Sequence, residues 1–179
     1  MVIFDATTLI AVVAPHAAIV PDGKGGNLTL VKERVDGLLA ELRKQKVKII
    51  LPTPAIAEAF VRTDAKAALE YIATLKKSRH FLIENFCEAA AFEVSQMTAK
   101  AKSAGDKKDG SDEVWAKIKY DRQIVAIGLV NRASRIYTDD GGLAATAQKS
   151  GITPIAVASL PVPTEKAQID WVRDAETEA

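Results

Sequence analysis

The sequence predicts an α/β fold with a mainly parallel sheet of about five strands and helices on both faces. Short apolar runs alternate along the chain with longer segments in which apolar residues recur at helical spacing. Parallel strands need crossover connections, so this alternation favours helices that cover both faces of the sheet. The 179 residues, 48% of them hydrophobic and 26% charged, suffice for one globular domain with its own core.

Five apolar runs are the expected strands. The first, Val2-Ile3-Phe4, ends directly at an aspartate, as a short buried strand would. The third is the least regular of the five. The expected strands cover residues 2–4, 47–51, 80–83, 135–138 and 152–157.

Helices are expected in the segments between these strands. Leucine and valine recur at three- and four-residue intervals up to Leu42, with charged residues between them. Thr53 followed by Pro54 is typical of a helix start. Asp112 is expected to cap a helix that runs to about Arg132, with a break near Tyr120. The other expected helices cover residues 7–13, 28–42, 55–61, 65–77, 86–104 and 142–149, and residues 16–27 are an expected loop.

Composition restricts the functional class. The 24 Lys and Arg residues nearly balance the 23 Asp and Glu residues, and a net charge of +1 excludes a strongly basic nucleic-acid coat. No segment approaches the roughly 18 apolar residues that cross a membrane. The start meets Asp5 at once, so no signal peptide is expected, and the single Cys87 fits a cytoplasmic location. We expect a domain over residues 1–157 and a tail over residues 158–179, with a short helix around Trp171.

Carboxylates follow the expected strands. Asp5 directly follows the first strand, and Asp139 and Asp140 directly follow the fourth. Glu58 lies in the first turns of the helix that leaves the second strand. Because parallel α/β sheets place their sites at the carboxyl ends of the strands, these side chains are expected at one edge.

Asp121 is expected at the same edge by a different route. Positions 121, 124, 125, 128 and 129 share one helical face, and that face is otherwise apolar or small. The helix runs toward the next strand, so its N-terminal end lies at the carboxyl edge of the sheet. Five acids from four separate stretches therefore point to one region.

Carboxylates held close together repel one another and raise each other's pKa, a conflict that a bound cation removes. Oxygen ligands without His or Cys suit Mg²⁺ or Mn²⁺. Such ions act on phosphates, so the pattern predicts phosphodiester hydrolysis. Each acid also has a structural alternative: Asp5 and Asp121 as helix N-caps, Asp139 and Asp140 as a turn, and Glu58 as a solvated helix residue.

In this order the motifs resemble those of the PIN-domain family of metal-dependent ribonucleases. The family pairs an apolar strand with Asp and a Ser/Thr two residues on, followed by three further acidic motifs. The resemblance covers about residues 1–157. The matching segments are Val2-Ile3-Phe4-Asp5-Ala6-Thr7, Pro54-Ala55-Ile56-Ala57-Glu58, Asp121-Arg122-Gln123-Ile124-Val125-Ala126 and Ile136-Tyr137-Thr138-Asp139-Asp140.

The resemblance implies a PIN-like three-layer sandwich that binds Mg²⁺ or Mn²⁺ and cuts RNA. It implies that Asp5, Glu58, Asp121 and Asp140 hold metal directly or through water, with Asp139 as a secondary ligand. Two supporting hydroxyls are expected near the pocket, those of Thr7 and Thr138. Three cations are candidates to contact RNA phosphates, since an acidic pocket alone repels the strand; they are Arg62, Lys66 and Arg122.

Two features depart from the family. Many members carry another Asp two places after the fourth acid, where this chain has Gly142 followed by Leu143. The chain is also longer than the compact VapC-type toxins. The resemblance implies a homodimer. It leaves open whether the protein is a toxin with an antitoxin partner or a housekeeping or orphan nuclease.

Two other functional classes compete with the ribonuclease. One is a catalytically inactive PIN-like module that binds RNA or protein, which Gly142 and the balanced charge favour. The other is a metal-dependent DNA nuclease of a different acidic-cluster fold. The basic cluster Lys100-Ala101-Lys102 is interpreted as a solvated face.

Overall fold

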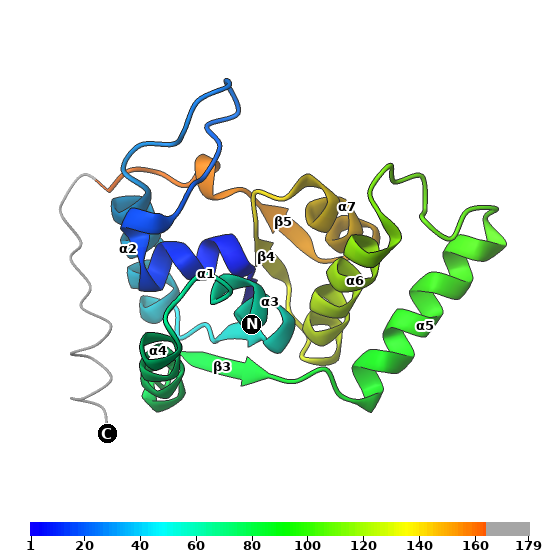
Figure 1. The fold of residues 1–179 in the computed structure, drawn as a ribbon, viewed down its shortest axis with the longest axis horizontal. Coiled ribbons are helices and arrows are strands. Elements are labelled where there is room, and N and C mark those ends of the chain that lie inside the picture. Colours follow the sequence, from blue (N-terminus) through cyan, green and yellow to red (C-terminus); the bar gives the residue numbers. More distant parts are fainter. Residues whose placement is uncertain (164–179) are drawn as a thin grey trace.

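The computed structural model describes residues 1–163 as a parallel sheet between two layers of helices (Figure 1). All neighbouring strands are parallel, in the order β3-β2-β1-β4-β5. The expected α/β fold with a five-stranded sheet and helices on both faces is confirmed. The strands are β1 (Val2–Phe4), β2 (Ile49–Pro52), β3 (Phe81–Glu84), β4 (Arg135–Tyr137) and β5 (Thr153–Ile155).

The helices lie close to their expected positions. Within residues 1–163, none of them has both the length and the apolar character that a membrane span requires. The expected helix around Trp171 lies outside the described residues. The helices are α1 (Ala6–Val13), η1 (Pro15–Ala17), α2 (Val31–Lys44), α3 (Thr53–Ala59), α4 (Ala65–Lys77), α5 (Glu88–Ser103), α6 (Trp115–Val130), α7 (Gly141–Lys149) and η2 (Val157–Ser159).

Alternate strand residues supply two separate cores. Val2 and Phe4 pack with α1, α2 and α4 on one face of the sheet, while Ile3 packs with α6 and α7 on the other. Each fully buried side chain of this size contributes about 1.5–3 kcal/mol. Gly128 lets α6 approach β1 closely, because a Cβ there would overlap the end of the Ile3 side chain. This contact positions the whole of α6 against the centre of the sheet.

Helix α6 differs from its expected form. It begins at Trp115, and its N-cap residue Val114 makes no side-chain cap, so the expected cap at Asp112 is wrong. The helix also continues unbroken past Tyr120, which excludes an N-cap role for Asp121. Tertiary packing explains both differences: one continuous helix brings the buried residues of α6 into the second core together.

The described chain continues to pack beyond residue 157. Leu160 is buried in the first core, and the Arg34 guanidinium donates a hydrogen bond to its carbonyl oxygen. Pro163 lies against Gly37 of α2, where an added Cβ would come within 2.7 Å of its ring. Residues 158–163 therefore cover α2 rather than leaving the domain directly after 157.

Candidate active site

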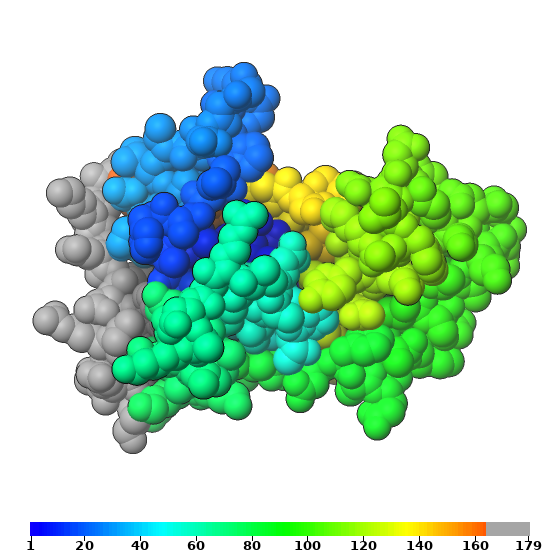
Figure 2. All heavy atoms as spheres, viewed as in Figure 1, coloured from blue at the N-terminus to red at the C-terminus, as the bar shows by residue number. Residues whose placement is uncertain are grey.

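A cavity of about 520 Å³ opens at the carboxyl ends of β1, β2 and β4. Four of the predicted carboxylates line it: Asp5, Glu58, Asp121 and Asp140. Each comes from a different part of the chain, as the sheet topology requires. Figure 2 shows the surface hollowed between the segments of α3 and α6, with the dark blue N-terminal segment at its floor.

Asp5 forms the buried wall of the cavity. It is only 3% exposed, and its Oδ1 accepts a hydrogen bond from the Thr8 amide at 2.7 Å. Asp5 is thus the N-cap of α1 as well as a residue of the cavity, so the structural and functional interpretations hold together. Burial raises its pKa to about 6, against the opposing hydrogen bonds from the Thr138 side chain and the Thr8 amide.

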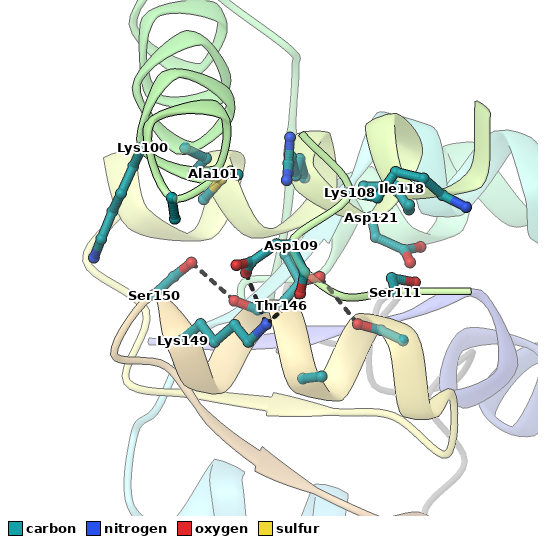
Figure 3. A pocket seen from close by; sticks show the side chains of 15 residues that line it. Lys100, Ala101, Lys108, Asp109, Ser111, Ile118, Asp121, Thr146, Lys149 and Ser150 are labelled. Carbon is teal, nitrogen blue, oxygen red and sulfur yellow. Dashed lines mark hydrogen bonds and ion pairs between the residues drawn. The ribbon is translucent and has the colours of Figure 1, made fainter. Parts of the chain in front are cut away.

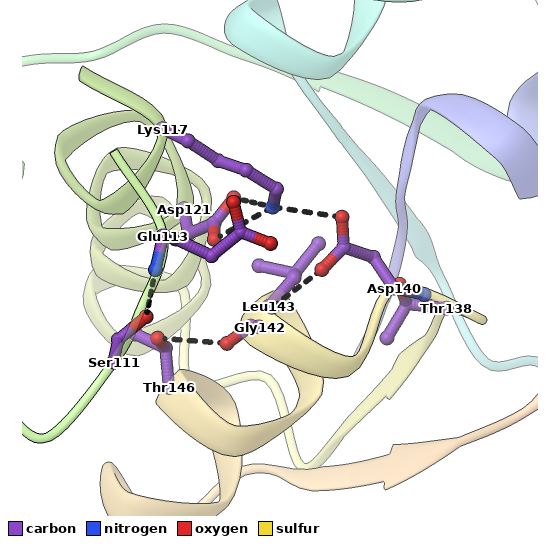
Figure 4. A network of polar contacts seen from close by, with 9 residues as sticks. All are labelled: Ser111, Glu113, Lys117, Asp121, Thr138, Asp140, Gly142, Leu143 and Thr146. Atoms are coloured by element: carbon purple, nitrogen blue, oxygen red, sulfur yellow. Dashed lines mark hydrogen bonds and ion pairs between the residues drawn. The ribbon is translucent and has the colours of Figure 1, made fainter. Parts of the chain in front are cut away.

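A lysine joins two of the acids (Figure 4). The Lys117 ammonium lies 3.0 Å from Oδ2 of Asp121 and 2.8 Å from Oδ2 of Asp140. Lys117 is not among the predicted site residues, although it stands four positions before Asp121, the spacing at which helical side chains meet. Two carboxylates that would otherwise repel each other therefore share one positive charge.

The two bridged acids differ in their protonation behaviour. Burial raises the pKa of Asp121 despite the Lys117 contact. Burial acts on Asp140 in the same direction, but hydrogen bonds from Lys117 and from the Leu143 amide outweigh it and lower its pKa. Asp140 is also the N-cap of α7, where the helix dipole favours a negative charge. Asp140 is accordingly the more readily ionised member of the pair.

Glu58 is the most exposed of the four acids. Its side chain lies at the surface of α3, and its charge contributes to the raised pKa of Asp121 after burial. The backbone that carries it is held in place: the Tyr120 hydroxyl on α6 donates to the Pro54 carbonyl at 3.0 Å. An exposed carboxylate on an anchored helix can turn toward the cavity without refolding.

The Asp139 carboxylate points away from the cavity. Its carboxylate accepts hydrogen bonds from the amides of Val157 and Ala158 at 3.2 and 3.3 Å, at the start of η2. It is not part of the cavity lining. Asp139 therefore bonds to the backbone of η2 in this structure. The family resemblance had implied that it is a secondary metal ligand.

The two expected hydroxyls lie at the site. Thr7 lines the cavity. Thr138 is buried, accepts a hydrogen bond from the Asp140 amide at 3.1 Å and interacts with Asp5. Thr138 thus connects the acid after β1 to the acid after β4.

The three expected phosphate-binding cations do not line this cavity. Arg122 is 4% exposed, and its guanidinium donates to Thr98 Oγ1 and to the Lys107 carbonyl, both at 2.9 Å. Arg62 and Lys66 are exposed and lie outside the lining. Arg122 faces a second cavity on the other side of Asp121. The sequence placed Arg122 next to Asp121, but helical geometry turns adjacent residues to different faces.

Gly142 lies directly beside the bridged acids. A Cβ at this position would lie 3.3 Å from Asp121 Oδ2, 3.3 Å from Asp140 Oδ1 and 3.5 Å from the Lys117 ammonium. A longer side chain at residue 142 would therefore start from within the polar network.

The donor set fits a hard divalent ion. The lining offers carboxylate oxygens and no His or Cys, the ligand chemistry of Mg²⁺ and Mn²⁺. Lys117 already holds a positive charge between two of these carboxylates. Among residues 1–163, however, no three His, Cys, Asp or Glu side chains are close enough together to hold a metal ion. Metal binding therefore requires the Lys117 ammonium to leave and the carboxylates to close in.

No protein-family model matches this chain, and no curated protein matches it. Its function is therefore inferred from the cavity and its residues.

Proposed function

We propose that this protein is a Mg²⁺- or Mn²⁺-dependent endoribonuclease. The observation that carries the proposal is one cavity lined by four carboxylates, Asp5, Glu58, Asp121 and Asp140, from four separate elements at the carboxyl edge of a parallel sheet. Carboxylates that lie close together repel one another, and a bound cation removes this repulsion. The ribonuclease class, rather than another phosphodiesterase, comes from the resemblance to PIN-domain motifs.

The protein's own groups have distinct tasks in this proposal. Asp121 and Asp140 would hold the metal, after exchange of the Lys117 ammonium, and Glu58 would turn in from α3. Asp5 would face them from the buried wall, oriented by the Thr8 amide. A bound metal would supply an activated water and offset the negative charge that develops on the phosphate.

Cleavage of a labelled single-stranded RNA tests the proposal. We expect cleavage with Mn²⁺, loss of cleavage with a chelator, and loss of at least about 100-fold in Asp5→Asn, as for removal of a preorganised electrostatic group. Asp64→Asn is the matched control, because Asp64 is an exposed N-cap of α4 that does not line the cavity. Equal cleavage by Asp5→Asn and wild-type protein would defeat the nuclease. Faster cleavage of DNA than RNA would favour the DNA nuclease instead.

A non-catalytic module that binds RNA or protein is the second candidate. Lys117 already neutralises part of the acidic charge, and Gly142 contributes no ligand, which favours this alternative. Titration calorimetry with Mn²⁺ separates the two candidates. Absence of binding at the cavity would support the module.

The proposed partners follow from the same reasoning. RNA is the proposed substrate, and an antitoxin protein or a second copy of the chain are proposed partners in the cytoplasm. Two large apolar side chains near α3 and α4 are exposed, Val61 at 77% and Leu69 at 68%, and Val61 also lines the cavity. A bound protein would cover such side chains.

A further inference from the structure

A second cavity, of about 370 Å³, lies between α5, α6, α7 and the loop that joins α5 to α6 (Figure 3). Asp121 lines both cavities, so the second adjoins the acidic one. Cationic side chains predominate in the second cavity, whereas carboxylates predominate in the first. Four cationic side chains and two carboxylates line the second cavity: Lys100, Lys108, Arg122 and Lys149, with Asp109 and Asp121.

Both carboxylates of this second cavity already have cationic partners. Asp109 pairs with Lys149 at 2.7 Å, as Figure 3 shows, and Asp121 pairs with Lys117 at 3.0 Å. Lys100 and Lys108 form no ion pair with any residue of the described chain, 1–163. Cationic side chains thus outnumber carboxylates in the lining, and Asp106 beside the cavity interacts electrostatically with Lys108 and Arg122.

Arg122 is the buried cation of this lining. Its guanidinium is buried, and it donates only to two neutral acceptors, the Thr98 hydroxyl and the Lys107 carbonyl. Within the described chain it forms no ion pair with a carboxylate. Burial lowers the pKa of Arg122, and the charges of Asp109 and Asp106 oppose this only in part. An anion in the cavity would offset more of the cost of burying this charge.

The walls of the cavity are held in place before any ligand arrives. The Arg122 guanidinium lies over the Trp115 ring at 5.4 Å, and Lys149 also donates to the Asp109 carbonyl at 2.9 Å. The Lys149 contact holds the α5–α6 loop against α7, and the Arg122 hydrogen bond to the Lys107 carbonyl holds the loop against α6. Ligand binding to an ordered wall loses less conformational entropy than binding to a free loop.

We propose that the second cavity binds a phosphodiester group of an RNA strand whose neighbouring phosphate lies over the acidic cavity. Lys100 and Lys108 line opposite sides of the cavity (Figure 3) and would contact the strand from those two sides, with Arg122 supplying buried positive charge. The identity of the strand rests on the proposed function. The volume lies within the range of small-ligand sites. A protein of net charge +1 has no overall attraction for RNA, so a local cationic site beside the acids is what keeps the strand in place.

Binding of a labelled single-stranded RNA in chelator, followed by fluorescence anisotropy, tests this proposal without cleavage. The test variant is Lys100→Gln/Lys108→Gln. The matched control is Lys76→Gln/Lys77→Gln, which removes the same charge from two exposed lysines at the end of α4. Thermal unfolding checks that both variants fold.

We expect the test variant to bind RNA about tenfold more weakly, with the control within about twofold of wild type. The dependence of log affinity on log salt should become shallower by about 0.7 for each phosphate that the variant no longer neutralises. Equal binding by the test variant and wild type, or equal weakening in the control, would overturn the proposal. So would wild-type protein that binds no RNA, or that binds AMP through these lysines but not RNA.

Cleavage assays in Mn²⁺ separate this outcome from that of the proposed function. If Asp5→Asn loses cleavage while the test variant binds RNA normally, the phosphate subsite is wrong and the nuclease stands. If the test variant loses RNA binding while wild-type protein cleaves nothing, the subsite stands and the nuclease is wrong.

Discussion

The Lys117 ammonium lies 2.8 Å from Asp140 Oδ2 and ties the first turn of α6 to the N-terminus of α7. The same nitrogen contacts Asp121, one helical turn further along α6. Its charge occupies the place between two carboxylates that a divalent ion would need. Occupancy by the lysine and occupancy by a metal therefore exclude each other.

Lys117→Met should bind Mn²⁺ about tenfold more tightly than wild type, a gain of about 1.4 kcal/mol. The reason is that the metal no longer has to displace an ammonium ion from Asp121 and Asp140. Calorimetry measures the affinity, and Lys119→Met, an exposed lysine of α6 outside the cavity, controls for net charge. Unchanged or weaker binding in Lys117→Met would contradict this competition.

Gly142→Asp should also tighten Mn²⁺ binding, by an amount on the order of tenfold. A Cβ at this position starts 3.3 Å from both bridged carboxylates, so an added carboxylate can join them around a metal. Gly142→Ala is the control, since it introduces the same Cβ without a ligand. The idea fails if the alanine and aspartate variants bind Mn²⁺ alike.

The stability of the metal-free protein should depend on the ionisation of Asp5. Because its pKa is raised to about 6 by burial, the folded state holds this proton more tightly than the unfolded chain, whose pKa is 3.8. The stabilisation is fully present below pH 3.8 and is lost as pH rises through 6. Each pKa unit corresponds to about 1.4 kcal/mol, so the loss is at most about 3 kcal/mol.

Denaturant unfolding of Asp5→Asn and wild-type protein in chelator, from pH 4 to pH 8, measures this effect. Asn keeps an N-cap acceptor but has no charge to desolvate, so the variant should gain stability relative to wild type as pH rises. Parallel stability curves would show that Asp5 has no raised pKa. Mn²⁺ binding by wild type should weaken below pH 6 for the same reason.

Asp139→Ala should reduce stability and leave metal binding unchanged. The substitution removes the acceptor for the Val157 and Ala158 amides, which costs roughly 1–3 kcal/mol for hydrogen bonds to a charged group. Chemical denaturation and Mn²⁺ calorimetry on the same preparation give both values. A loss of Mn²⁺ affinity at unchanged stability would restore Asp139 as a ligand.

The sheet, its parallel strands and the edge at which the acids gather could all be predicted from the amino-acid pattern. These features follow from local spacing: a residue that follows a strand, or heads a helical face, has its place set by the two periodicities of the backbone. Asp5, Glu58, Asp121 and Asp140 line one cavity as that reasoning expects.

The partner of each charged group, by contrast, depends on how the elements pack together. Lys117 reaches Asp140 because α6 packs against α7, and Asp139 turns to η2 because β5 places that segment beside it. Arg122 is buried because α5 and its loop close over it. Such contacts depend on the distance between elements remote in sequence, and the spacing of residues within one helix carries no information about that distance.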